Sequence, residues 1–138
     1  MRFKGKVWKD GKFWLIEVPA LDVMTQGNTK REALEMIADA IEVLVDKPDF
    51  KIEVHAGRGD EIEVGSEDIG LLTALFLQRR RQASGLTLAE TAKRLGAKSH
   101  NAYARYEQGK SVPTIEKLVE LLSVVDSERD FVVSRSQF

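Results

Sequence analysis

The sequence predicts an α+β protein with two successive domains, an α+β domain over residues 1–65 and an all-helical domain over residues 66–138. Two observations predict this division. Before residue 66, alternating polar and apolar runs are typical of strands and surround one long helical pattern. From Ser66 onward the strand pattern stops, and capping residues and glycines divide the chain into amphipathic helical segments.

The first domain opens with a predicted hairpin. The strand-like runs 2–8 and 12–18 flank Asp10-Gly11, a pair that tolerates the positive φ of a tight turn. The second run is apolar on both faces, which favours an interior strand. A third extended run, 22–26, follows it.

A helix is predicted after these strands. Thr29 and Glu32 have the spacing of a capping box, and Pro48 closes the helical pattern. The apolar stripe of this helix consists of Leu34, Ile37, Ile41, Leu44 and Val45. Two further alternating runs, 51–55 and 61–64, complete the order βββαββ.

Four helices are predicted in the second domain. The expected N-terminal caps of the first three are Ser66, Thr87 and Ser99, and Pro113 and Thr114 start the fourth. The first three are expected to stop at Gly85, Gly96 and Gly109. The apolar residues Phe131–Val133 near the end of the sequence suit either an extra strand or an oligomer contact.

Composition excludes several protein classes. The 138 residues contain no Cys and two His, and the formal net charge is −1. A disulfide scaffold, a thiolate metal site and a cysteine nucleophile are therefore excluded. No apolar run is long enough for a membrane span, so we expect a soluble, cytoplasmic protein with no membrane partner. Because no metal-ligand or catalytic spacing occurs, we expect no catalytic residue, cofactor or metal.

Positive charge is concentrated in one segment. Residues 1–65 carry a net charge of −3, whereas residues 78–111 hold eight Lys or Arg against Glu90 and Glu107, a net +6. Such a segment indicates a polyanion partner, and the alternative is a solvated helical face.

The spacing within this segment predicts a helix-turn-helix. Two helices of about eight residues, separated by Gly96-Ala97-Lys98, should cross at a large angle and present the second helix to solvent. We expect Tyr103 and Tyr106 to pack inward. The residues expected to share the opposite face of that helix are His100, Asn101, Ala104, Arg105 and Gln108.

Candidate DNA contacts follow from this arrangement. Asn and Arg side chains pair with adenine and guanine edges, so Asn101 and Arg105 are the candidate base readers. Phosphate contacts belong at the turns that flank the helix. The candidate DNA-binding residues are Lys98, Ser99, His100, Asn101, Ala104, Arg105, Lys110 and Ser111.

The helical segment resembles the Cro/Xre helix-turn-helix family over about 50 residues. The resemblance is carried by Gly85–Gly96, by Ser99–Gly109 with its Tyr-Glu-Gln-Gly-Lys signature, and by Pro113–Leu118. Leu88 stands where the family usually has Gln, Thr91 where it is usually apolar, and the turn is one residue longer. The resemblance implies sequence-specific DNA binding.

The first domain resembles the HicB antitoxin domain. The matching segments are the strand Phe13–Pro19, the Thr25-Gln26-Gly27-Asn28-Thr29 motif, and Glu32-Ala33-Leu34 at the start of a helix with Ala40. This resemblance implies a partial ribonuclease H-like fold that neutralises a HicA-like messenger-RNA endonuclease, while the attached DNA-binding module represses the operon. We interpret Thr25-Gln26-Gly27 itself as turn chemistry.

The resulting hypothesis is an antitoxin and repressor whose partners are operator DNA and a HicA-like toxin. One short helix reads few base pairs, so we expect a homo-oligomer, either a dimer or a dimer of dimers, joined through the tail near Phe131 or a sheet edge. Two alternatives remain: a phage-like repressor with a sensing N-terminal domain, and a ribonuclease H-like nuclease using Asp10 or Glu17. The nuclease is disfavoured because the acidic residues show no convergent spacing.

Overall fold

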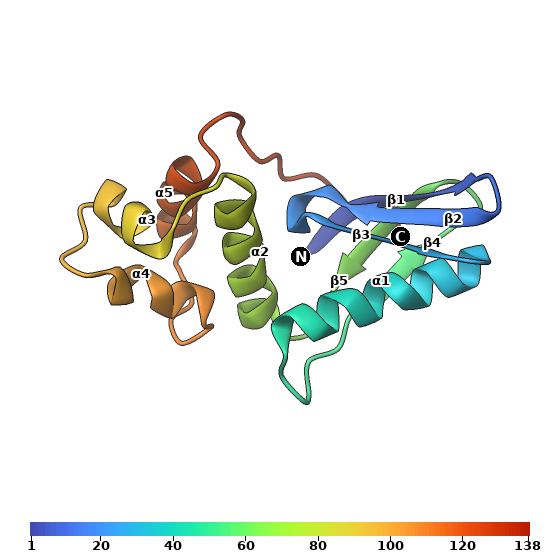
Figure 1. Cartoon of the computed structure of the whole chain (residues 1–138), viewed down its shortest axis with the longest axis horizontal. Coiled ribbons are helices and arrows are strands. Elements are labelled where there is room, and N and C mark those ends of the chain that lie inside the picture. Colours follow the sequence, from blue (N-terminus) through green and yellow to red (C-terminus); the bar gives the residue numbers. More distant parts are fainter. The chain divides into compact units, whose positions relative to one another are not determined.

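The computed structural model describes residues 1–138 and divides into two compact units (Figure 1). The N-terminal unit comprises residues 1–72 together with 135–138, and the helical unit comprises residues 73–134. The change of unit at residue 72 lies within helix α2 (Ile69–Ala83). The chain therefore passes between the units twice, once within α2 and once after Ser134.

A five-stranded antiparallel sheet forms the N-terminal unit, in the order β3-β2-β1-β5-β4. The strands are β1 (Arg2–Asp10), β2 (Phe13–Val18), β3 (Val23–Gly27), β4 (Glu53–Ala56) and β5 (Glu61–Gly65). The βββαββ order is as predicted, and β2 is interior, between β1 and β3. The α+β class is confirmed by this sheet and the helices that follow it.

Helix α1 (Lys30–Val45) packs against this sheet, chiefly on β3 and β2. The Oγ1 of Thr29 accepts the N–H of Glu32 at 3.1 Å, as predicted, and the Glu32 carboxylate accepts the N–H of Asn28 at 3.0 Å. A methyl group on Gly27 would lie 2.5 Å from the backbone N of Ala33. Glycine at this position therefore lets the end of β3 approach the first turn of α1 closely.

The two faces of the sheet differ in polarity. On one face, cross-strand neighbours are buried and apolar, as in the pairs Phe3 with Val64 and Val7 with Ile16. On the other face, Lys4 opposes Glu63 and Lys6 opposes both Glu17 and Glu61. This alternation is typical of an antiparallel sheet with one face in the core. We call the second, charged face the open face.

The helical unit contains the second part of α2 with α3 (Leu88–Arg94), α4 (His100–Glu107) and α5 (Ile115–Val125). The predicted glycine stops are confirmed. At the end of α3, Gly96 has φ 72°, its N–H donates to Lys93 O at 3.0 Å, and the N–H of Ala97 donates to Ala92 O at 2.9 Å. These two bonds form a Schellman motif, which requires a left-handed residue.

Of the side-chain caps predicted at Ser66, Thr87 and Ser99, only that of Thr87 is present, and Thr114 provides a further cap at the start of α5. Thr87 accepts from Glu90 N and Thr114 from Lys117 N, each at 3.1 Å. The cap predicted at Ser66 is wrong: Ser66 Oγ accepts from Asp68 N at 3.2 Å in the turn before the helix, and Asp68 itself caps α2 by accepting from Leu71 N at 3.0 Å. Ser99 occupies the N-cap position of α4, but its side chain makes no capping hydrogen bond.

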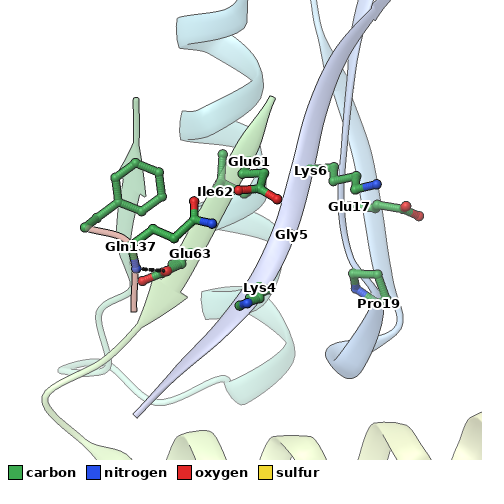
Figure 2. Close-up of a pocket in the computed structure, with 10 residues that line it drawn as sticks. Lys4, Gly5, Lys6, Glu17, Pro19, Glu61, Ile62, Glu63 and Gln137 are labelled. Atoms are coloured by element: carbon green, nitrogen blue, oxygen red, sulfur yellow. Dashed lines mark hydrogen bonds between the residues drawn. The ribbon is translucent and has the colours of Figure 1, made fainter. Parts of the chain in front are cut away.

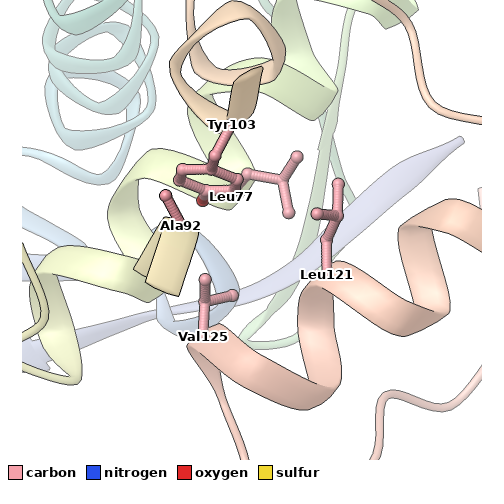
Figure 3. Packing of buried hydrophobic residues seen from close by; sticks show 5 residues of the cluster. All are labelled: Leu77, Ala92, Tyr103, Leu121 and Val125. Carbon is pink, nitrogen blue, oxygen red and sulfur yellow. The ribbon is translucent and has the colours of Figure 1, made fainter. Parts of the chain in front are cut away.

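The core of the helical unit takes one or two buried side chains from each helix (Figure 3). They are Leu77, Ala92, Tyr103, Leu121 and Val125. Tyr106 packs against this cluster, as its predicted inward position requires.

The segment Phe131–Val133 forms no strand, so that alternative is wrong. The Phe131 ring instead packs edge-on against Phe76 of α2, with the ring centroids 4.9 Å apart, and the Arg80 guanidinium lies 6.0 Å from the Phe131 centroid.

None of the helices has the length and apolar character that crossing a membrane requires.

Candidate nucleic-acid interface

Helices α3 and α4 pack against each other and are joined by Leu95–Ser99. The left-handed Gly96 turns the chain immediately after α3. The leading end of α4 is open to solvent, because Ser99, His100 and Asn101 are all exposed. The two short helices thus have the arrangement that the sequence predicts, with the start of the second helix accessible to a ligand.

Asn101 and Arg105 lie on the outer side of α4. Both side chains are exposed, and their spacing of four residues places them one turn apart on the same stripe. Tyr103, between them in sequence, is 1% exposed and lies in the core. Arg105 Nε donates to Ser111 Oγ at 3.4 Å, a contact between α4 and the segment that follows it.

Ala104 corrects the predicted outer face. It is 5% exposed and lies on the buried side of α4 with Tyr103, whereas Ala102 is exposed. The exposed residues of α4 are His100, Asn101, Ala102 and Arg105, and Gln108 at its C-cap is exposed as well. The sequence prediction placed Ala104 on the exposed side of α4. An alanine is tolerated on either side of a helix, and only packing contacts decide which side it occupies.

The predicted phosphate-binding residues lie at both ends of α4. Lys98 and Ser99 precede the helix and are exposed, and Lys110, which follows it, is exposed as well. Ser111 is half-buried, and its N–H donates to Arg105 O at 3.3 Å. Except for Ala104, the predicted site residues are thus gathered on and around one short helix.

Arg81 and Glu107 form a buried ion pair beneath this helix. Arg81 Nε lies 2.7 Å from Glu107 Oε2 and Arg81 Nη2 lies 2.9 Å from Glu107 Oε1, while Nη1 donates to Leu86 O at 2.8 Å. The two side chains are 12% and 6% exposed. The hydrogen bonds that Arg81 donates to the Glu107 carboxylate raise the pKa of Arg81, so the guanidinium stays charged.

Sequence reasoning missed this pair. It counted Arg81 among the cations of the positive segment and Glu107 among its few acids. The available signal was the spacing of four residues between Tyr103 and Glu107, which places Glu107 on the inner side of α4. Burial also raises the pKa of Tyr103 far above its usual value, so its hydroxyl stays neutral beside the pair.

The exposed positive charge is therefore smaller than the sequence count. Arg81 is paired with Glu107, and Arg80 Nε lies 3.1 Å from Asp126 Oδ2 with both side chains less than one-fifth exposed. The exposed cations of the segment are Lys93, Arg94, Lys98, Arg105 and Lys110. They come from α3, the turn, α4 and the residue after Gly109, so the charge available to a polyanion surrounds α4.

The acidic residues of the sheet do not assemble a metal centre. No group of three or more His, Cys, Asp or Glu side chains within residues 1–138 is placed to hold a metal ion. Glu17 lies half-buried on β2, and Asp10 is exposed at the end of β1.

This arrangement is that of a helix-turn-helix DNA-binding domain. The helix-turn-helix family model matches residues 77–132, which begin in α2 and extend past α5. That family consists of sequence-specific DNA-binding transcription regulators rather than enzymes, and the match supports this class of function for the helical unit. No curated protein matches the chain.

Proposed function

We propose that this chain is a HicB-type antitoxin of a type II toxin-antitoxin pair. Its helical unit represses its own operon by binding operator DNA, and its N-terminal unit sequesters a HicA-like messenger-RNA endonuclease in the cytoplasm. The observation that carries the DNA-binding part is the exposed Asn101–Arg105 stripe on α4. The resemblance of residues 13–40 to the HicB domain carries the antitoxin part, and residues 1–65 and 66–138 would serve the two functions separately.

In this proposal α4 enters the major groove with its N-terminal end leading. Asn101 pairs with an adenine edge and Arg105 with a guanine edge, each worth roughly 1–3 kcal/mol of discrimination against other bases. The exposed Ala102 methyl is suited to a thymine methyl group. His100 lies at the leading end, and Lys98, Ser99, Lys110 and Ser111 hold the phosphates on either side.

Two copies are required for a selective operator. A helix of eight residues contacts only a few base pairs, and a two-fold dimer doubles the number that are read. The half-sites are then about 34 Å apart or a multiple of that distance. The homo-oligomer is a dimer or a dimer of dimers.

Toxin neutralisation in this proposal is occlusion of a basic RNA-binding surface. Residues 1–65 carry a net charge of −3, which complements such a surface and speeds the encounter. The N-terminal unit acts as a binding partner and takes no part in cleavage.

Two measurements test the two halves separately. Fluorescence anisotropy with the promoter fragment upstream of the gene, in the presence of excess nonspecific DNA, tests the repressor function. Co-expression with the neighbouring gene product, followed by copurification on a tagged chain, tests the antitoxin function. DNA binding without copurification would leave a repressor with a sensing N-terminal unit. RNA cleavage by the purified chain with Mg²⁺ or Mn²⁺ would contradict the proposal.

A further inference from the structure

An extended segment of the chain lies on the open face of the N-terminal sheet. Arg135–Phe138, here called the tail segment, belongs to the N-terminal unit and has no regular secondary structure. Glu63 Oε2 accepts the main-chain N–H of Gln137 at 2.7 Å, drawn as the dashed line in Figure 2. Arg2 Nη1 donates to the main-chain O of Phe138 at 2.5 Å.

The two side chains that hold the tail segment also hold each other. Glu63 is 3% exposed on β5, and its Oε1 accepts from Arg2 Nη1 at 3.2 Å, which leaves Oε2 for the tail. The N–H of Gln137 and the nearby Arg2 keep the pKa of Glu63 below its usual value. An ionised carboxylate and a guanidinium are thus fixed side by side, one as acceptor and one as donor.

This pair contacts mainly the backbone of its ligand. Glu63 accepts a main-chain N–H and Arg2 donates to the main-chain O of Phe138, and the one side-chain contact of Arg2 to the segment is to Ser136 Oγ at 3.2 Å. The aromatic side chain is placed by a glycine, since a Cβ on Gly57 would lie 3.0 Å from the Phe138 ring. The site therefore fits an extended peptide with an aromatic residue one position after the bound N–H.

The tail segment covers only part of the open face. A cavity of about 260 Å³ continues beside it across β1, β2 and β5. Its lining residues are Lys4, Gly5, Lys6, Glu17, Pro19, Glu61, Ile62, Glu63, Gln137 and Phe138. A longer extended segment than the tail has room to lie on this face and to meet both lysines and carboxylates there.

We propose that Arg2, Glu63 and Gly57 form a binding site for an extended segment of a partner protein, and that the tail segment is its resident, exchangeable ligand. The tail is joined to the sheet by side-chain contacts and by no strand pairing, so its release disrupts no ladder hydrogen bond. This site goes beyond the proposed function, because it requires neither DNA binding nor a toxin as the partner.

The test uses the full chain and a fluorescent peptide with the sequence of residues 132–138, acetylated and amidated so that no terminal charge contributes. Gln137→Pro removes the N–H that Glu63 accepts and releases the resident tail, whereas the matched control Gln137→Ala keeps that N–H. We expect the Gln137→Pro chain to bind the peptide at least about tenfold more tightly than the Gln137→Ala chain, measured by anisotropy.

Two further variants locate the bound peptide. In the Gln137→Pro chain, Glu63→Gln should weaken peptide binding by about tenfold, whereas Asp39→Asn, at an exposed carboxylate of α1 outside the cavity, should change it less than twofold. A second peptide, with Pro in place of its Gln, should fail to compete for the unmodified site, which tests the same hydrogen bond without altering the sheet. No binding by the Gln137→Pro chain, or equal competition by the Pro peptide, would overturn the proposal. Neither result bears on operator binding or on copurification with the neighbouring gene product.

Discussion

Arg81 of α2 and Glu107 of α4 form a bidentate ion pair, at 2.7 and 2.9 Å, that fixes α4 from its buried side. Asn101 and Arg105 lie on the opposite, exposed side of the same helix. The orientation of Asn101 and Arg105 therefore depends on an ion pair that is buried on the side of α4 away from the proposed DNA contacts. A rigid support of this kind is what a base-reading side chain requires.

Removing one partner of this pair should destabilise the helical unit strongly. Glu107→Ala leaves the Arg81 guanidinium buried and unpaired, which should cost about 3–5 kcal/mol in the free energy of unfolding. Urea titration followed by helical circular dichroism measures the loss. Glu90→Ala removes an exposed carboxylate of α3 and should change stability by less than about 0.5 kcal/mol. Equal losses for the two variants would show that the pair does not stabilise the unit.

Base contacts and phosphate contacts should respond differently to mutation. Arg105→Ala should lower operator affinity by about 1–3 kcal/mol and relax the preference at one base pair. Lys98→Ala should weaken binding to every sequence and reduce the salt slope of log K by about one. Anisotropy titrations on operator and scrambled duplexes, each at several salt concentrations, separate the two effects. Indistinguishable behaviour of the two variants on both duplexes would refute the assigned roles.

The two alanines of α4 should differ in what a larger side chain does. Ala104→Leu overpacks a buried position and should destabilise the helical unit by about 1–3 kcal/mol. Ala102→Leu places the same side chain in solvent, so it should leave the unfolding midpoint nearly unchanged and weaken operator binding by steric conflict in the groove. Thermal unfolding and anisotropy of both variants check this reversal. If Ala102→Leu lost more stability than Ala104→Leu, then Ala102 would be the buried alanine and Ala104 the exposed one, as the sequence predicted.

Docking of the tail segment should weaken in acid. The pKa of Glu63 is lowered in the folded chain, mainly by the N–H of Gln137, so the carboxylate binds the tail more strongly when ionised. This contribution is complete above the ordinary glutamate value of 4.5 and is lost as pH falls through the lower folded pKa. The Gln137 amide resonance, followed from pH 7 to pH 3, should move toward its free position below pH 4.5. Glu63→Gln should abolish this titration, and an unchanged profile would assign it to another group.

Local signals in the sequence predicted local structure well. The caps at Thr29 and Thr87 and the stop at Gly96 each depend on residues within one turn, and all three are confirmed. The strand order in the sheet follows partly from the same kind of signal, because each hairpin pairs neighbours in sequence. The central position of β1, between β2 and β5, depends on a long-range pairing that alternation alone does not specify.

Distant partners were beyond sequence reasoning. Arg81 meets Glu107 across 26 residues, and Glu63 meets Gln137 across 74. Nothing in the residue types distinguishes these pairs from the many other oppositely charged or polar combinations in a chain that is 31% charged. Ala104 was misplaced for a related reason, since a methyl group is tolerated on either side of a helix and only packing decides between them.

The tail segment brings the last residue of this sequence beside the first strand, with Phe138 O on Arg2 Nη1. In the sequence, residues 73–134 are therefore inserted between two segments of the N-terminal unit. During synthesis, Arg2 and Glu63 therefore gain their partners from residues 135–138 only after all of the helical unit has been made.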